Sequence, residues 1–278
     1  MQRAMEIGRR CAQTSLPVLL VGERGVGKDW LARQIHGGSS RATGVWSKLQ
    51  GSAATPDSLA DQFHRAYGGT LYLEDIDQTS CAVQAQLRSL VEPLVAAGNN
   101  LSEALKAHPR LIASTACDTA DLLGRQLIHQ ELYFLFSPAS IYIPPLRERV
   151  EDIPEFVEFF LSRAASTITS ELKLSLTQES LKKIVRYDWP GNLEQLQSCI
   201  LRAALLSDGC DLEIDPEIDY APFGKSRTDS QQSADPVDDR SASQSVVVKS
   251  SNNLPIDLSE LTRYLVSRGI IEADKARL

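Results

Sequence analysis

The first residues that could do chemistry form a glycine-rich loop, Gly22-Glu23-Arg24-Gly25-Val26-Gly27-Lys28-Asp29. Its glycines let the backbone turn so tightly that successive N–H groups can point at phosphate oxygens. Lys28 can reach the outer phosphates as a positive charge, and a following helix adds the positive end of its dipole. The loop therefore predicts a nucleotide phosphate site; an ordinary glycine-rich turn is the alternative. Asp29 stands where a Ser or Thr usually holds Mg²⁺.

A second acidic element could complete such a site. The segment Thr70-Leu71-Tyr72-Leu73-Glu74-Asp75 is an apolar strand pattern that ends in two carboxylates. ATPases place carboxylates at the end of a neighbouring strand, where they hold Mg²⁺ and position water. Glu74 and Asp75 are thus the candidate Mg²⁺ ligands, and Asp75 is the candidate catalytic group. A strand that runs into a solvated acidic turn is the simpler alternative.

Five short apolar segments, separated by helical patterns, must position these groups. The predicted strands are Leu16–Val21, Val45–Leu49, Thr70–Glu74, Arg110–Ser114 and Ser140–Ile143. The predicted helices include a segment that begins after the loop, Pro56–Ala66, Val83–Leu94, and a helix that starts near Asp152-Ile153-Pro154. Short apolar strands alternating with helices indicate a parallel sheet covered on both faces. Further along, Thr177 and Asn192 are expected to cap two more helices.

Composition limits the class of protein. The chain has 278 residues, a net charge of −7 and five scattered cysteines, none of them in metal-ligand or CxxC spacing. The negative charge argues against a broad nucleic-acid surface. Buried, reduced thiols are expected of a cytoplasmic protein. No apolar run is long enough to span a bilayer, and the N-terminal segment lacks the apolar region of a secretory signal.

Five motifs, taken together, resemble one family. Residues 22–29 resemble GESGTGKE, residues 66–75 ANGGTLFLDE, residues 83–90 the VQAKLLRVL helix, residues 144–149 PPLRER, and residues 187–193 YDWPGNV. Their order and spacing are similar to those of the AAA+ ATPase domain of bacterial sigma-54-dependent activators of the NtrC type. The resemblance covers residues 1–212, and this family normally carries an acidic residue where Asp29 stands.

The resemblance implies a P-loop AAA+ fold of the α/β class: a three-layer α/β/α core with a five-stranded parallel sheet, plus a small all-α lid domain. It suggests a nucleotide-binding core over 1–165 and a lid over 166–207. Outside the resemblance, the composition rich in Ser, Asp, Gln and Pro predicts a disordered or weakly ordered linker over 208–254, and the apolar pattern beyond it predicts a short C-terminal helix over 255–278. ATP and Mg²⁺ are the implied cofactors. The nucleotide-binding residues that it adds to the loop are Ala66, Tyr67, Gly68, Gly69, Thr70, Leu71, Tyr72, Leu73, Glu74 and Asp75.

The chain departs from the family where catalysis and sigma-54 contact reside. Its interval over residues 50–63 contains no GAFTGA loop, and the Asp-Glu pair of the family's Walker B strand is reversed as Glu74-Asp75. The other altered positions are Gln50 for the Asn that gates the catalytic Glu, Ala116 for a sensor Asn, His129 and Leu135 for two trans-acting arginines, and Glu194 for a lid Arg. A trans-acting arginine can contribute ~10³–10⁵ in rate.

These departures predict an ATP-binding transcription regulator of the sigma-54 activator type with impaired or absent hydrolysis and no direct sigma-54 contact loop. A slow but active ATPase, or a scaffold that binds no nucleotide and modulates an active homologue, are the alternatives. Expected partners are further copies of the chain, AAA+ homologues and the transcription machinery. Asp257–Leu278 offers one short helix, too little for a complete DNA-binding domain.

Overall fold

The core of the protein is a five-stranded parallel sheet, as predicted. A computed structural model describes residues 1–96, 108–168, 174–207 and 211–216. The strands are β1 (Val18–Val21), β2 (Trp46–Gln50), β3 (Thr70–Glu74), β4 (Arg110–Thr115) and β5 (Ser140–Tyr142). Their order is β2-β3-β4-β1-β5, with every pairing parallel. Because β1 lies inside the sheet and all its residues are buried, the loop that follows it starts from a rigid base.

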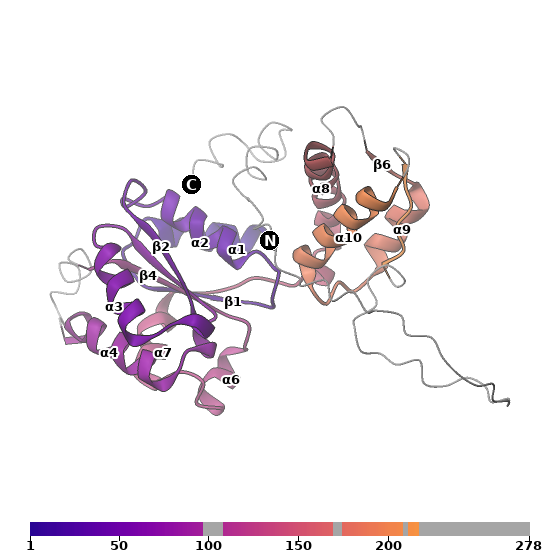
Figure 1. Cartoon of the computed structure of the whole chain (residues 1–278). Helices are drawn as coiled ribbons and strands as arrows, with labels where there is room; N and C mark the ends of the chain where they lie inside the picture. The colour runs from indigo at the N-terminus through magenta and orange to yellow at the C-terminus, as the bar shows by residue number, and fades with distance from the viewer. Residues whose placement is uncertain (97–107, 169–173, 208–210, 217–278) are drawn as a thin grey trace, which may run out of the picture.

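Helices cover both faces of this sheet, which confirms the three-layer α/β/α architecture (Figure 1). The pleat of β1 explains how: Val18 and Leu20 belong to one buried cluster, while Leu19 and Val21 belong to the other. The first cluster includes residues of the helices α1 (Gln2–Ala12) and α2 (Lys28–Gly37). The second includes residues of α3 (Pro56–Arg65), α4 (Cys81–Ala96), α6 (Thr119–Gly124) and α7 (Gln130–Phe136).

The core helices are only partly those predicted: α2, α3 and α4 lie close to the predicted positions, and α1, α6 and α7 are additions. The short 3₁₀ turns are η1 (Gly51–Ala53), η2 (Ile76–Gln78), η4 (Ser137–Ala139), η5 (Leu146–Glu148) and η6 (Val150–Asp152). Helix α1 was not predicted from the sequence. It buries small residues, and a Cβ on Gly8 would lie 3.0 Å from Leu31 of α2.

A smaller, mainly helical lid follows the core (Figure 1). Its helices are α8 (Ile153–Ile168), α9 (Gln178–Arg186) and α10 (Asn192–Leu206). Two short strands, β6 (Ser175–Leu176) and β7 (Asp211–Leu212), pair in parallel and add a small sheet to the predicted all-α lid. Thr177 caps α9 as predicted, because its side chain accepts a hydrogen bond from the backbone N–H of Ser180.

Three sequence predictions about this lid need correction. The boundary at residue 165 falls inside α8, which packs against α10 in the same buried cluster and lies with the lid in Figure 1. The linker does not begin at residue 208, because Leu212 and Ile214 are buried against the lid. Asn192 does not cap α10 with its side chain; Gly191 occupies the cap position without a side-chain bond. Residues 217–278, with the rest of the predicted linker and the C-terminal helix, lie outside the described residues.

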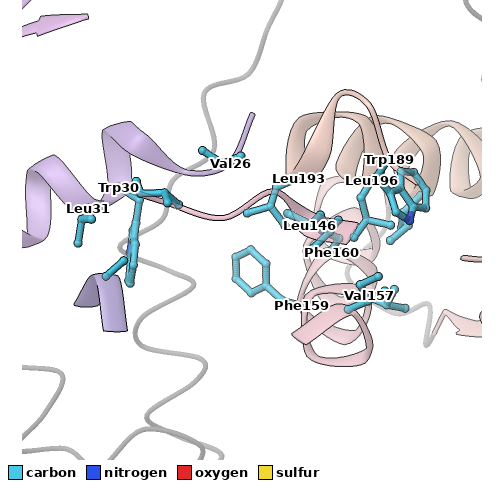
Figure 2. Close-up of a cluster of buried hydrophobic side chains, with 14 of the residues drawn as sticks. Val26, Trp30, Leu31, Leu146, Val157, Phe159, Phe160, Trp189, Leu193 and Leu196 are labelled. Atoms are coloured by element: carbon cyan, nitrogen blue, oxygen red, sulfur yellow. The ribbon is translucent and has the colours of Figure 1, made fainter. Parts of the chain in front are cut away.

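One apolar cluster joins the lid to the core (Figure 2). Val26 and Trp30 contribute from the loop and α2, Leu146 from the connection, and Leu193 from the lid. Phe159 of α8 lies between the two parts in the close-up. Burial of such side chains stabilises contact by ~1.5–3 kcal/mol each. The lid is therefore packed directly against the glycine-rich loop.

Candidate functional site

The loop between β1 and α2 has the backbone that a phosphate site requires. Gly25 and Gly27 have φ values of 74° and 100°, a left-handed region that favours glycine. Space is equally restrictive: a Cβ on Gly22 would lie 2.7 Å from the carbonyl oxygen of Ile143, and one on Gly25 would lie 2.4 Å from that of Gly191. Gly22 thus lets the loop pass close to the end of β5, and Gly25 lets it pass close to the lid.

Lys28 is folded back onto this loop. Its ammonium donates hydrogen bonds to the carbonyl oxygens of Gly22 at 2.7 Å and Glu23 at 3.0 Å. Burial lowers the pKa of Lys28, and the carboxylates of Asp75 and Asp77 are the leading groups that oppose this shift. A nearly buried ammonium held only by carbonyl oxygens can turn toward an incoming phosphate, which would supply a full negative charge.

Glu23 ties the loop to the connection between core and lid. Arg147 donates two hydrogen bonds to its carboxylate, at 2.8 and 2.5 Å, and Asn192 donates a third at 3.1 Å. The Arg147 hydrogen bond is the main reason that the pKa of Glu23 is lowered. Its carboxylate therefore anchors the loop, whereas the sequence had assigned Glu23 to the nucleotide.

The lid is hydrogen-bonded to the same loop. Asn192 is fully buried, and its side chain accepts from the N–H of Leu146 at 2.7 Å and donates to the carbonyl oxygen of Arg24 at 2.9 Å. The N–H of Leu193 donates to the carbonyl oxygen of Gly25 at 3.0 Å. Asn192 has a φ of 51°, a strained conformation that the surrounding bonds hold in place. These contacts of Asn192 and Leu193 with the loop and its support, which we call the clasp, were not predicted from the sequence.

A buried arginine, Arg149, supports the backbone of the loop. Arg149 donates to the carbonyl oxygen of Val26 at 2.9 Å, and its guanidinium lies 5.7 Å from the ring centroid of Phe156. Burial lowers its pKa. Together with Arg147, it makes the segment after β5 the main support of the phosphate loop.

The acidic side of the site begins where β3 ends. Glu74 follows the buried part of this strand, and Asp75 has a left-handed φ of 51°. The N–H of Asp75 donates to the hydroxyl of Ser114 at 3.2 Å, which also accepts from the hydroxyl of the buried Tyr72 at 3.0 Å. This chain of bonds fixes the backbone at the end of β3, beside the phosphate loop.

Basic side chains already occupy this acidic side. Lys48 of β2 donates to Asp29 at 3.0 Å and to Glu74 at 3.1 Å, and Arg33 donates to Asp29 at 3.0 Å. Asp75 lies 4.0 Å from Arg24. Within the described part of the chain, no group of three or more His, Cys, Asp or Glu residues converges as a metal site. Carboxylates have the right chemistry for Mg²⁺, but these already face cations of the protein, so the residues present do not fit a resident Mg²⁺.

Part of the predicted nucleotide set does not reach the site. The parallel register pairs Thr70 with Trp46 at one end of β3 and Glu74 with Gln50 at the other, next to the loop. Residues of a strand rise by ~3.3 Å each, so the two ends lie ~13 Å apart. The residues at the far end are Ala66, Tyr67, Gly68, Gly69 and Thr70, and those buried inside the sheet are Leu71, Tyr72 and Leu73. Only Glu74 and Asp75 of this set border the phosphate loop.

Two family models match this chain. The sequence model of the sigma-54 interaction domain matches residues 5–146. The chain belongs to the sigma-54 interaction domain family. A model described as the AAA+ ATPase lid domain matches residues 147–233, so it too begins before α8. No helix among the described residues has the length and apolarity needed to cross a membrane.

Members of this family with curated descriptions are similar over most of the chain. The glycerol metabolism operon regulatory protein of Citrobacter freundii is 31% identical over 235 residues, covering 79% of this chain and 36% of the relative. The Nif-specific regulatory protein of Klebsiella pneumoniae is 30% identical over 228 residues, covering 75% and 43%. The chain thus spans less than half the length of these two relatives.

Solved structures show the same fold. NtrX from Brucella abortus, in complex with ATP, superposes with a TM-score of 0.66 and 25% identity, covering 78% of this chain and 54% of that one. A RuvB mutant from Thermotoga maritima, with a TM-score of 0.51 and 18% identity, covers 76% of this chain and supports the fold alone.

Within this family, the structure shows where the altered positions of this chain lie. Glu194, on the first turn of α10, is close enough to Glu74 and Lys28 for both to affect its pKa, which desolvation raises most strongly. Leu135 packs into the buried cluster on the α7 face of the sheet. His129 is exposed at the start of α7, and its backbone N–H donates to Gln84 at 2.8 Å. Gln50 is paired in register with Glu74.

Proposed function

We propose that this protein is an ATP-binding transcription regulator of the sigma-54 activator type whose ATP hydrolysis is impaired or absent. Membership of the sigma-54 interaction domain family supports regulation of transcription. The relative from Brucella abortus was solved with ATP, which supports ATP as the nucleotide. The phosphate loop, with Lys28 facing inward, supports binding in this chain.

One observation carries the hydrolysis part of the proposal: a carboxylate, Glu194, stands on the lid where the family resemblance implies a positive charge. A carboxylate near the phosphates repels the negative charge that the transition state spreads over the transferred group. The chain also has Leu135, partly buried against the core cluster, and His129 at the positions where the resemblance implies two arginines that reach a neighbouring subunit. A neutral leucine cannot stabilise phosphate charge.

The missing contact loop limits what the protein does with sigma-54. The connection from β2 to β3 consists of η1, the ten-residue helix α3 and short turns, and the sequence holds no GAFTGA there. We propose that the protein acts by joining rings of active AAA+ homologues, or of its own copies, and tuning them. Such a subunit would leave its neighbour's site without trans-acting arginines.

Equilibrium binding and pull-down together test this function. Calorimetry with ATP should give a measurable affinity that Lys28→Ala weakens by about 10- to 100-fold, because a charge-assisted bond contributes ~1.5–3 kcal/mol. A control variant, Arg125→Gln, removes an exposed pair with Asp121 and should bind ATP as the wild type does. Capture of a full-length sigma-54 activator by the protein would support the partnership. Wild-type protein that neither binds ATP nor joins a homologue contradicts the proposal.

A further inference from the structure

Lys48 lies in this site, although it belongs neither to the phosphate loop nor to the acidic end of β3. It projects from β2, a strand that carries none of the predicted phosphate ligands, and its ammonium lies between Asp29 and Glu74 at 3.0 and 3.1 Å. These carboxylates come from two different elements: Asp29 follows the loop lysine, and Glu74 ends β3. The ammonium thus bridges the phosphate loop and the acidic strand end.

The position of this bridge is the one a divalent cation would need. In a phosphate loop, the residue after the lysine is a metal ligand, and a carboxylate at the end of the neighbouring strand is the other. Asp29 and Glu74 hold these two places in the chain, and Lys48 contacts both. Two cations within ~4 Å of each other repel strongly, so a metal ion and the ammonium exclude one another there.

The lysine is also held in this position by its surroundings. Its ammonium lies 5.6 Å from the ring centroid of Tyr72, whose ring is stacked on Trp46 and whose hydroxyl is bonded to Ser114. Tyr72 is fully buried, so its ring is held in a fixed position beside the ammonium. The neighbouring carboxylate, Asp75, has its own basic partner, since Arg24 lies 4.0 Å away.

We propose that Lys48 takes the place of Mg²⁺ in this site, so that the protein binds ATP without a divalent cation. The inference rests on the proposed function, because it concerns how the same pocket meets a triphosphate. Lys48, together with Arg33 on Asp29, offsets the charges of Asp29 and Glu74, and Lys28 is left to face the phosphate charge. Without Lys48, Glu74 would lose its basic partner and Asp29 would keep only Arg33, so a metal ion would be needed to offset the remaining negative charge.

The test measures ATP affinity with Mg²⁺ and with EDTA for the wild type and for Lys48→Met. The ATP affinities of the wild type in Mg²⁺ and in EDTA are expected to agree within about threefold, because the Lys48 ammonium already supplies the positive charge that Mg²⁺ would bring. Lys48→Met is expected to bind ATP at least about tenfold more weakly in EDTA, because Glu74 is left without a charge partner. Mg²⁺ should restore most of this loss, because the metal ion can then bind where the ammonium stood. Lys48→Arg keeps the charge and should stay independent of the metal.

Lys183 supplies a matched control. It also bridges two carboxylates, Asp215 at 3.0 Å and Glu179 at 4.0 Å, but lies in the lid on α9. Lys183→Met should leave the metal dependence as it is in the wild type. Wild-type binding that requires Mg²⁺, or a Lys48→Met variant whose affinity is the same in both buffers, overturns this inference alone. Absence of ATP binding by the wild type in both buffers overturns the proposed function as well.

Discussion

The two sides of the site are held by different means. The phosphate-loop side, residues 22–29, is fixed by the segment after β5 and by the lid, through Arg147 and the buried Asn192. The acidic side, made of Glu74 and Asp75 with Glu194 of the lid nearby, faces basic groups of the chain. Under the proposed function, binding and turnover depend on different residues, so ATP binding is expected to persist where hydrolysis is impaired.

The largest effect is expected from a change on the phosphate-loop side, Gly25→Ala. The new Cβ would lie 2.4 Å from the carbonyl oxygen of Gly191, in a residue whose φ is 74°. Both loop and lid must shift, so ATP affinity measured by calorimetry should fall at least about 100-fold. Gly124→Ala is the control, because a Cβ there meets nothing within 4 Å. Equal effects of the two changes would show that the loop geometry does not matter.

The clasp between lid and loop should be the next most sensitive point. Asn192→Ala removes three side-chain hydrogen bonds from a buried position. The free energy of unfolding in a urea titration should fall by about 2–4 kcal/mol. Asn192→Gly relieves the positive φ but not the lost bonds, so it should recover only part of the loss. Full recovery in the glycine variant would mean that backbone strain, and not the clasp, sets the effect.

On the acidic side, Glu194→Arg should strengthen binding without creating turnover. The change replaces a repulsive charge near Lys28 and Glu74 with an attractive one, so ATP affinity should rise about tenfold. Phosphate release should stay undetectable, because Leu135 still offers no charge to a neighbour. Glu179→Arg, on an exposed turn of α9, serves as the control and should change neither quantity. An unchanged affinity in Glu194→Arg would place this residue away from the bound phosphates.

The smallest effect concerns pH and the partly exposed pair of Glu23 and Arg147. The pKa of Glu23 is lowered in the folded protein, so its contribution to stability is present above the ordinary glutamate pKa and is lost as pH falls through the lowered value. Because both side chains are over a third exposed, this contribution should be below ~1 kcal/mol. Arg147→Ala should reduce the loss of stability between pH 7 and pH 3, measured by thermal unfolding. A steeper loss in the variant would contradict this assignment.

Much of the fold could be predicted because its signals are local. The five strands are short apolar runs, and their ends in the structure differ from the predicted ends by at most two residues. Helix α1 was missed because its contact face is made of small residues, Ala4, Gly8 and Ala12, which leave no apolar stripe in the sequence. The lid boundary was misplaced because only packing shows that α8 lies against α10.

The site was predicted less completely because its organisation is not local. The phosphate loop is a continuous motif, and Glu74 follows a recognisable strand. Resemblance over a whole motif also brought in residues 66–70, which sit at the far end of β3. The contacts of Asn192 with Glu23 and of Lys48 with Asp29 join positions far apart in the chain. The spacing of residues in the sequence does not predict such contacts.

The central claim is that this site holds ATP without hydrolysing it. The most direct measurement loads the purified protein with ATP labelled on the γ-phosphate, separates it from free nucleotide, and follows the label with time beside a Lys28→Ala sample. We expect wild-type protein to retain intact ATP and to release no labelled phosphate above the variant's background. Release of phosphate by the wild type at a rate that Lys28→Ala abolishes would contradict the account.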